Sequence, residues 1–269
     1  MRIVKFLIVK NMGIGLHKIE NHIDGFKEEI KMASSSSPRT FFNWFDDCGG
    51  DVYDNFLSGK CEFILYILTP LLGLLKKPAD KVVLEIGYGG GRLLAAAAEI
   101  FKTAVGVDIH ENSDLVSQEL KRRCVENFQL LQNDGRHIPV GDCEVDLVYS
   151  NIVLQHVEKI DIFESYVKES FRVLKHDGYV VLYFGRLFTF SLNTKSSLLY
   201  AIDTLLEKIC FRGYKEIFTR VNVTNLKITM NYAQSVCEKV GFSVVGHGVS
   251  RKIPSLRYGG QNYLVLKKI

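Results

Sequence analysis

The feature that most constrains this fold is a regular alternation of short apolar strands and helical segments that begins at Lys81. Val82–Ile86 predicts the first strand, and the Ala- and Leu-rich stretch Arg92–Phe101 predicts the helix that follows it. Further strands of this series are predicted at 104–108, 128–132, 145–149 and 179–184. Strands that are almost continuously apolar are typical of a parallel sheet covered by helices on both faces. The pattern therefore predicts a doubly wound α/β fold.

The regularity stops after the fifth strand. Residues 186–228 predict a cap insertion whose clearest element is a helix at Ser196–Ile209. Its leucines and isoleucines fall on one side, so we expect that side to cover something apolar. A helix at Met230–Val240 and two last strands, 242–249 and 262–267, then complete a seven-stranded sheet.

The N-terminal part of the chain differs in composition from this core. Residues 1–39 predict an extension that ends in a polar linker at Ser34–Pro38, and residues 40–269 predict a single domain. The aromatic stretch that starts at Thr40 predicts a helical segment. It fits either a helix docked on the core or a lid over a substrate.

The turn after the first strand carries the strongest indication of function. Gly87, Gly89 and Gly91 let the backbone turn sharply and let a ligand approach the main chain. Ligands of open α/β sheets bind at the carboxyl ends of the strands. Asp108, which ends the second strand, can accept hydrogen bonds from both hydroxyls of a ribose at that place. A nucleoside-containing ligand is therefore expected.

The glycine spacing argues against a dinucleotide. The dinucleotide pattern Gly-x-Gly-x-x-Gly, counted from Gly87 or Gly89, would place its third glycine at Arg92 or Leu94. The pattern present is Glu85-x-Gly-x-Gly-x-Gly. With it, the chain resembles the class I S-adenosylmethionine-dependent methyltransferases, and among them the small-molecule enzymes that include those of ubiquinone and menaquinone biosynthesis.

The resemblance extends over five ordered segments between Lys81 and Phe184, and from Met230 onward by topology. It implies a Rossmann-like fold of the methyltransferase type and S-adenosyl-L-methionine as the cofactor. The residues it assigns to the cofactor are Glu85, Gly87, Gly89 and Gly91 near the methionine portion, Asp108 and Ile109 near the ribose, Asp134 and Gly135 near the adenine, and Asn151 near the sulfonium.

His156 is the predicted catalytic residue. A methyl group on a sulfonium transfers by in-line displacement, so positioning alone can supply most of the rate, and a hydroxyl acceptor also gains from a general base. His156 follows the fourth strand, near the expected position of the methyl group. Asp46 and Asp47 are more remote candidates for the same role.

The composition of the chain limits which kinds of partner it is expected to bind. Its 34 basic and 30 acidic side chains leave a net charge of +4, which is too mild to indicate nucleic-acid binding. The aromatic residues of the cap insertion favour a small, partly apolar acceptor. Three alternatives stay open: an RNA methyltransferase, a non-catalytic cofactor-binding regulator and an NAD-dependent oxidoreductase.

The remaining features indicate where the protein works. The six cysteines form no Cys-x-x-Cys pair, so no metal site is expected, and a reducing cytoplasm fits them best. The apolar run Phe63–Leu75 is too short to cross a bilayer, and we interpret it as a buried helix.

Overall fold

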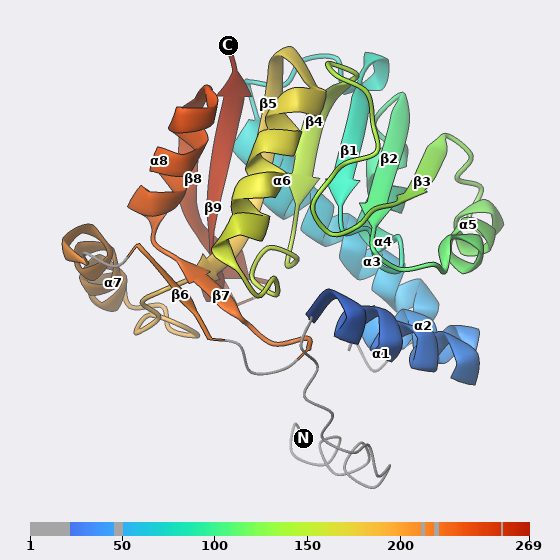
Figure 1. The fold of residues 1–269 in the computed structure, drawn as a ribbon, viewed down its shortest axis with the longest axis horizontal. Helices are drawn as coiled ribbons and strands as arrows, with labels where there is room; N and C mark the ends of the chain where they lie inside the picture. Colours follow the sequence, from blue (N-terminus) through green and yellow to red (C-terminus); the bar gives the residue numbers. More distant parts are fainter. Residues whose placement is uncertain (1–21, 46–50, 211–212, 218–220, 254) are drawn as a thin grey trace, which may run out of the picture.

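The computed structural model describes residues 22–45, 51–210, 213–217, 221–253 and 255–269 (Figure 1). Within these ranges the strands form one nine-stranded sheet. Five strands run parallel in the order β3, β2, β1, β4, β5. Their bounds are β1 Val82–Ile86, β2 Thr103–Asp108, β3 Phe128–Gln132, β4 Val145–Ser150 and β5 Leu174–Arg186.

Two antiparallel strands extend the sheet beyond β5. Strand β9 (Arg257–Lys268) pairs with β5 on one side and with β8 (Phe242–Lys252) on the other. The seven predicted strands are therefore all present. Two short strands that the sequence did not reveal, β6 (Tyr214–Glu216) and β7 (Leu226–Ile228), come from the cap insertion. Strand β7 pairs with the last two residues of β5.

Helices cover both faces of the sheet, as predicted. One face packs against α3 (Val52–Glu62), α4 (Arg92–Ala98) and α5 (Ser113–Arg122), and the other against α6 (Ile160–Val173) and α8 (Met230–Val240). Neighbouring residues of one strand enter opposite cores: Val83 packs on the first side and Leu84 on the second, and both are fully buried. Burial on both faces explains why these strands are continuously apolar.

The predicted linker at Ser34–Pro38 is wrong, because within this stretch only Ser37 lies outside a helix. Helix α1 spans His22–Ser36 and helix α2 spans Pro38–Phe45. The hydroxyls of Ser34, Ser35 and Ser36 each donate to a carbonyl three or four residues earlier, which keeps them inside the helix. Proline is tolerated at the first position of a helix, so Pro38 starts α2 instead of ending a helix.

The aromatic residues of α2 divide between the core and a cavity. Phe41 and Phe42 are buried in the core, whereas Trp44 and Phe45 line a cavity. Asp46 and Asp47, the remote candidates for a base, lie outside the described residues.

The apolar run after α3 is only half buried. It forms a π-helical segment, η3 (Phe63–Leu68), and a 3₁₀ turn, η4 (Thr69–Leu71), and a second 3₁₀ turn, η5 (Pro78–Asp80), leads into β1. Phe63, Ile67 and Leu71 are buried, whereas Leu72 is exposed. Among the helices of the described ranges, none has the length and apolar character needed to cross a membrane.

Helix α7 (Ser197–Ile209) forms where it was predicted, but its orientation contradicts the prediction. Asp203 and Glu207 face inward and are buried, while Leu198, Leu205 and Ile209 are exposed. The buried ion pair between Asp203 of α7 and Arg186 of β5 determines which side of the helix faces the protein.

Candidate functional site

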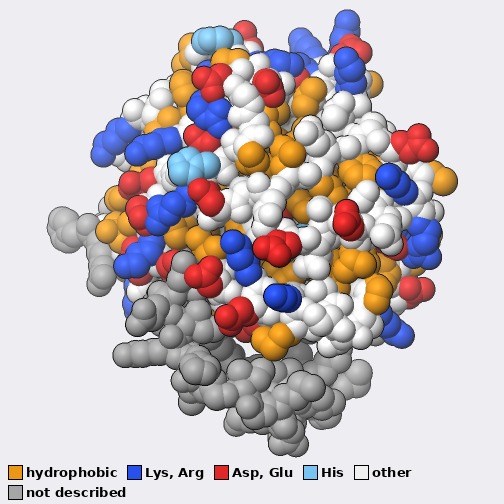
Figure 2. All heavy atoms as spheres, turned by 45° about the vertical axis from the view of Figure 1, so that its right-hand side comes forward, with side chains coloured by type: hydrophobic (Ala, Val, Ile, Leu, Met, Phe, Trp, Pro, Cys, Tyr) orange, Lys and Arg blue, Asp and Glu red, His pale blue; other side chains and the backbone are white. Residues whose placement is uncertain are grey.

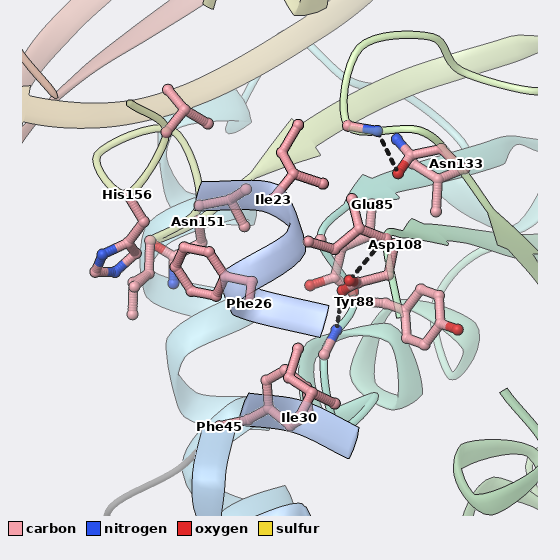
Figure 3. Close-up of a pocket in the computed structure, with 18 of the residues that line it drawn as sticks. Ile23, Phe26, Ile30, Phe45, Glu85, Tyr88, Asp108, Asn133, Asn151 and His156 are labelled. Carbon is pink, nitrogen blue, oxygen red and sulfur yellow. Dashed lines mark hydrogen bonds between the residues drawn. The ribbon is translucent and has the colours of Figure 1, made fainter. Parts of the chain in front are cut away.

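A cavity lies at the carboxyl ends of β1, β2 and β4, and helix α1 passes across it (Figure 3). Its wall is built from the loop after β1, the end of β2, the turn after β3, the segment after β4, and helices α1 and α2. This is the edge of the sheet at which open α/β folds bind their ligands.

The loop after β1 is wound tightly by its glycines. Gly87, Gly89 and Gly91 have φ angles of +78°, +51° and +81°, in the region that residues with a Cβ rarely adopt. A Cβ on Gly87 would overlap the side chain of Val153, and one on Gly89 would lie 2.7 Å from Phe45 Cδ1. Gly87 and Gly89 line the cavity.

Gly91 has a different role from the other two. It is the N-cap of α4, and a Cβ there would lie 2.7 Å from Val116 of α5. It is not among the residues that line the cavity. Its glycine is therefore explained by the turn into the helix and by close packing between α4 and α5.

Asp108 fastens the glycine loop to the end of β2. Its Oδ2 accepts the Gly89 N–H at 2.8 Å, and its Oδ1 accepts the N–H of Ile109 at 2.7 Å and that of His110 at 3.4 Å. A carboxylate offers about four acceptor sites. The buried side chain therefore holds the loop and keeps acceptor capacity for hydroxyls in the cavity, which it lines together with Ile109.

His110 contacts the glycine loop and stabilises it, a role that was not predicted from the sequence. The ring is buried, its Nε2 lies 3.1 Å from the Gly89 carbonyl, and its Nδ1 accepts the Asn112 N–H at 3.1 Å. Nε2 must then carry the proton, so the ring is neutral and both nitrogens are satisfied. The Tyr88 ring packs edge-on against it, with centroids 4.9 Å apart.

Glu85, at the end of β1, is a second buried acid in the cavity wall. Its Oε2 accepts the Tyr149 hydroxyl at 2.8 Å. Burial and the neighbouring Glu85 carboxylate raise the pKa of Tyr149 well above its usual value, so the tyrosine stays protonated and donates. The carboxylate is thus held in a fixed orientation beneath the loop.

The turn after β3 corrects one prediction. Asp134 does not line the cavity, whereas its neighbours Asn133 and Gly135 do. The Asp134 side chain is exposed and accepts hydrogen bonds from the N–H groups of Arg136 and His137, and it pairs with His137 Nδ1 at 2.7 Å. Partial burial raises the pKa of Asp134, but these bonds outweigh it and lower the pKa to about 2.

Asn133 takes the position in the wall that was predicted for Asp134. The side chain is buried, its Nδ2 donates to the Tyr166 hydroxyl at 3.1 Å, and its Oδ1 accepts the Gly135 N–H at 3.3 Å. Gly135 has a φ of +87°, and a Cβ there would lie 2.6 Å from Ile23 Cδ1. Helix α1 therefore packs directly on this turn.

Helices α1 and α2 supply an apolar wall that the sequence did not predict in detail. Ile23, Phe26 and Ile30 of α1 point into the cavity, and Phe45 of α2 lies beside them (Figure 3). Trp44 packs edge-on against Phe26, with centroids 6.0 Å apart. The spacing of the α1 residues, three and four apart, is what places them on one side of a helix.

The segment after β4 brings Asn151 and His156 to the opposite side of the cavity from Glu85 and Asp108 (Figure 3). Burial lowers the pKa of His156 below its usual value, although a hydrogen bond to the Val223 carbonyl acts in the other direction. That bond, 2.7 Å from Nδ1, requires a proton on Nδ1. The lone pair of Nε2 is therefore available as an acceptor, and the Gln155 amide lies 3.3 Å from it.

The charges in the wall fit a cation better than a diphosphate. The acidic side chains are Glu85, Asp108 and Glu158, while the one arginine among the lining residues, Arg92, pairs with Glu62 at 2.8 Å. An anionic diphosphate would be repelled by such a wall, whereas a sulfonium and an ammonium group would be attracted. Together with the ribose acceptor Asp108, this charge pattern fits S-adenosylmethionine.

Comparison with known proteins agrees with this reading of the cavity. The family model described as "Methyltransferase domain" matches residues 84–182, which include the end of β1, the glycine loop, Asp108 and His156. This segment of the chain is therefore similar in sequence to methyltransferase domains. Solved structures similar in fold to this chain include proteins described as S-adenosylmethionine-dependent methyltransferases, from Methanosarcina mazei and Listeria monocytogenes.

The curated methyltransferases that the chain resembles differ in their substrates. One is a malonyl-[acyl-carrier protein] O-methyltransferase of Marinomonas sp. (strain MWYL1), 27% identical over 50% of this chain and 48% of its own length. Another is a tRNA (guanine-N(7)-)-methyltransferase of Helicobacter pylori, 30% identical over 40% of this chain and 30% of its own length. The chain thus spans about half, or less, of the length of these relatives.

A solved methyltransferase structure shares the fold over most of the chain. The magnesium protoporphyrin IX methyltransferase of Synechocystis PCC 6803, determined with bound SAH, superposes with a TM-score of 0.59. It is 15% identical in sequence, and the match covers 91% of this chain and 98% of that protein. At this identity the likeness establishes the fold alone.

Proposed function

We propose that the protein transfers a methyl group from S-adenosylmethionine to a hydroxyl of a small, partly apolar acceptor. The observation that carries the proposal is a neutral histidine beside an apolar wall. The His156 ring meets Phe26 edge-on, with centroids 6.3 Å apart, and Trp44 and Val157 line the same cavity. An apolar acceptor buries surface against this wall while its hydroxyl meets a group that can take a proton.

The chain contributes positioning and a proton acceptor. When bound, the cofactor supplies a methyl group on a positively charged sulfur. Holding an acceptor in line with that group is worth up to about 7–11 kcal/mol of the barrier. His156 Nε2 accepts the hydroxyl proton, an effect of about 10²–10⁴-fold in rate. For this, the acceptor hydroxyl takes the place of the Gln155 amide at Nε2.

The side chain of Glu158 favours a methyl acceptor that carries a second hydrogen-bond donor. Its side chain lines the cavity, and its buried Oε2 has no hydrogen-bond partner among the described residues. A buried hydrogen-bond acceptor atom that has no donor partner costs about 1–3 kcal/mol of stability. An acceptor that carries an O–H or N–H at a distance from its reacting hydroxyl would satisfy this atom.

A small molecule is favoured over RNA, although one of the relatives acts on tRNA. Helix α1 covers the cavity with apolar side chains, which offer nothing to a phosphate backbone. On the face shown in Figure 2, Lys and Arg side chains lie among Asp and Glu side chains instead of forming a basic stripe. A face on which acidic and basic side chains alternate attracts a phosphate backbone less than a basic stripe does.

We also propose that the protein works in the reducing environment of the cytoplasm. Four cysteines within the described residues, Cys61, Cys124, Cys143 and Cys237, form no disulfide. Disulfides are rare in that compartment because thiols are kept reduced there.

The test is methyl transfer from labelled S-adenosylmethionine to a panel of phenols, aliphatic alcohols, carboxylic acids, amines and bulk tRNA. We expect turnover with an aromatic or aliphatic hydroxyl and none with tRNA. Turnover with tRNA alone would overturn the choice of acceptor. Cofactor binding without turnover on any acceptor would favour a non-catalytic regulator.

A variant pair tests the role of His156. His156→Gln removes the base, so we expect kcat to fall by about 10²–10⁴-fold while the Kd for S-adenosylmethionine changes less than about twofold. The control is His137→Gln, an exposed histidine whose partner Asp134 lies outside the cavity wall. An unchanged kcat in His156→Gln would remove this residue as the base.

A further inference from the structure

Helix α7 is amphipathic in the reverse sense. Its acidic residues Asp203 and Glu207 are buried, whereas Leu198, Ile202, Leu205 and Ile209 are 70%, 39%, 58% and 59% exposed. These four residues are spaced by four, three and four positions, so they share one side of the helix. The loop before α7 adds Phe190, which is 60% exposed.

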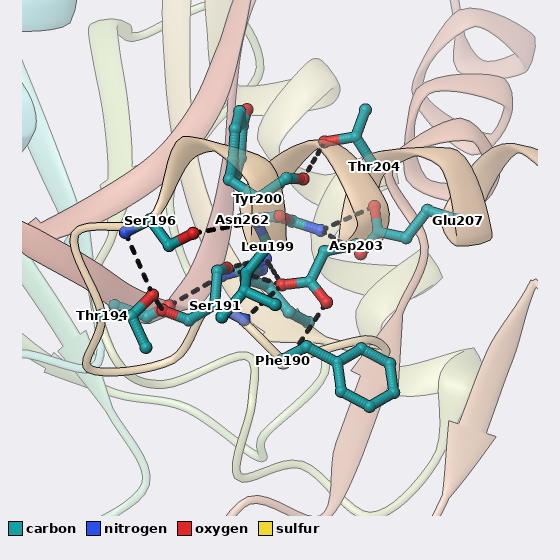
Figure 4. Close-up of polar contacts among 12 residues, drawn as sticks. Phe190, Ser191, Thr194, Ser196, Leu199, Tyr200, Asp203, Thr204, Glu207 and Asn262 are labelled. Carbon is teal, nitrogen blue, oxygen red and sulfur yellow. Dashed lines mark hydrogen bonds and ion pairs between the residues drawn. The ribbon is translucent and has the colours of Figure 1, made fainter.

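A buried ionic network fixes this orientation (Figure 4). Asp203 Oδ2 accepts from Arg186 at 2.7 Å and from the Ser191 N–H at 2.9 Å, and Oδ1 accepts the Phe190 N–H at 2.8 Å. Both members of the Arg186–Asp203 pair are almost fully buried. Rotating α7 to hide its leucines would expose these groups and leave Arg186 uncompensated.

Glu207 holds the next turn of the helix in the same way. One carboxylate oxygen accepts the Met230 N–H at 3.2 Å, and the carboxylate also lies 3.3 Å from the Asn262 amide of β9. Burial raises the pKa of Glu207, which these hydrogen bonds partly offset. The buried contacts of Asp203 and Glu207 therefore keep the apolar side of α7 exposed.

The end of the β8–β9 hairpin continues this surface. Asn193, in the loop before α7, contacts Lys252, and the Tyr258 N–H donates to the Thr194 carbonyl at 3.0 Å. Tyr200 of α7 stacks on Tyr258, with ring centroids 4.6 Å apart. The hairpin end adds two more exposed apolar side chains, Ile253 at 41% and Leu256 at 63%.

The charged side chains exposed on these two segments are all basic. Lys195 and Lys208 are exposed on and beside α7, and Arg251 and Arg257 on the hairpin. Residues 187–202 and 239–269 contain no Asp or Glu, and the two acids of α7 are buried in the network. Two copies of such a surface would repel each other, whereas an anionic surface would attract it.

We propose that this surface, formed by α7, the loop before it and the β8–β9 hairpin end, binds the surface of an anionic phospholipid bilayer. Aliphatic and phenylalanine side chains on one side of a helix, flanked by lysines, are the pattern that lies in a membrane interface. The surface follows the carboxyl end of β5, the same end of the sheet as the cavity (Figure 1). The protein would thus meet apolar acceptors dissolved in the bilayer.

Flotation of the full-length protein with vesicles tests this proposal. We expect co-flotation with vesicles of phosphatidylcholine mixed with phosphatidylglycerol, weakened by added salt, and little with phosphatidylcholine alone. Leu198→Ser combined with Leu205→Ser should weaken vesicle binding at least about tenfold. The matched control is Leu72→Ser, an equally exposed leucine in the connection that leads to β1.

A second pair of variants tests the electrostatic part. Lys195→Gln with Lys208→Gln should lower binding to the anionic vesicles, while Lys121→Gln on α5 should not. Melting temperature and cofactor affinity should stay unchanged in all of these surface variants. Equal flotation of the wild type and the double leucine variant would overturn the proposal. So would a dimer, seen by sedimentation velocity, that the leucine substitutions dissociate, because the face would then serve self-association.

Discussion

Asp108→Asn is the substitution that tests the cofactor site most sharply. The change keeps the shape of the side chain but removes its charge and replaces one acceptor oxygen by a donor. Asp108 accepts two short backbone hydrogen bonds at 2.7 and 2.8 Å, one on each oxygen, so the new NH₂ group must face either the Gly89 or the Ile109 N–H. In each arrangement at least one favourable hydrogen bond is lost.

The expected loss follows from the strength of such bonds. A hydrogen bond to a charged group contributes about 1.5–3 kcal/mol. Losing one and weakening the other gives about 2–4 kcal/mol, which is a Kd about 30- to 1000-fold higher. Isothermal titration calorimetry with S-adenosylmethionine and S-adenosylhomocysteine measures this directly, and the melting temperature of the unliganded variant reports separately on the fold.

The control is Asp134→Asn, the acid that the sequence assigned to the adenine and the structure places outside the cavity. Its side chain is exposed and engages His137. We expect its Kd to match that of the wild type within about twofold, since a surface ion pair contributes at most about 1 kcal/mol to stability and nothing to this cavity. A change of less than threefold in Asp108→Asn, or an equal loss in both variants, would refute the reasoning.

Three further predictions concern catalysis, the loop and the network. Burial lowers the pKa of His156, so the rate should be flat around neutral pH and should fall only as the pH drops below 6.5 through that lowered pKa. A kcat–pH profile measures this, and a fall in rate centred above pH 7 would contradict the prediction. Gly87→Ala should destabilise the protein by at least about 1–2 kcal/mol and weaken cofactor binding, because φ there is +78° and the new Cβ overlaps Val153. A denaturant unfolding curve that matches the wild type would show that the loop adapts. Asp203→Ala should cost about 3–5 kcal/mol of unfolding free energy because it leaves Arg186 buried and unpaired, and a cost below 1 kcal/mol would show that water replaces the pair.

The strands and the glycine loop could be predicted because their signals are local. A strand buried on both faces must be continuously apolar, and a turn with φ near +80° at Gly87 must use glycine. The place of Asp108 follows from the same local order, since it ends a strand whose neighbour carries the loop. These parts of the site therefore depend on short stretches of sequence.

The assignment of Asp134 failed because a turn reverses side-chain direction within one residue. Asn133 and Asp134 could each contact the adenine. The sequence does not show which of the two side chains bonds to the backbone of the turn instead. In the structure the Asp134 carboxylate accepts from the N–H groups of Arg136 and His137, and this turns it away from the cavity.

The orientation of α7 and the helical serines could not be predicted because both depend on partners elsewhere in the chain. Asp203 is buried only because Arg186, seventeen positions earlier, lies at the end of β5. Likewise, Ser34–Ser36 read as a linker from composition, but α1 continues through them and its earlier residues pack over the cavity. A periodic pattern shows that a helix has two sides, not which side faces the protein.

The central claim is tested most directly by a crystal structure of the protein with S-adenosylhomocysteine. We expect the ribose hydroxyls to lie on the Asp108 carboxylate, the adenine to contact Asn133 and Gly135 beneath Ile23, and the sulfur to face the side of the cavity that holds Asn151 and His156. A ligand bound elsewhere, or a sulfur on the far side of the glycine loop from His156, would contradict the account.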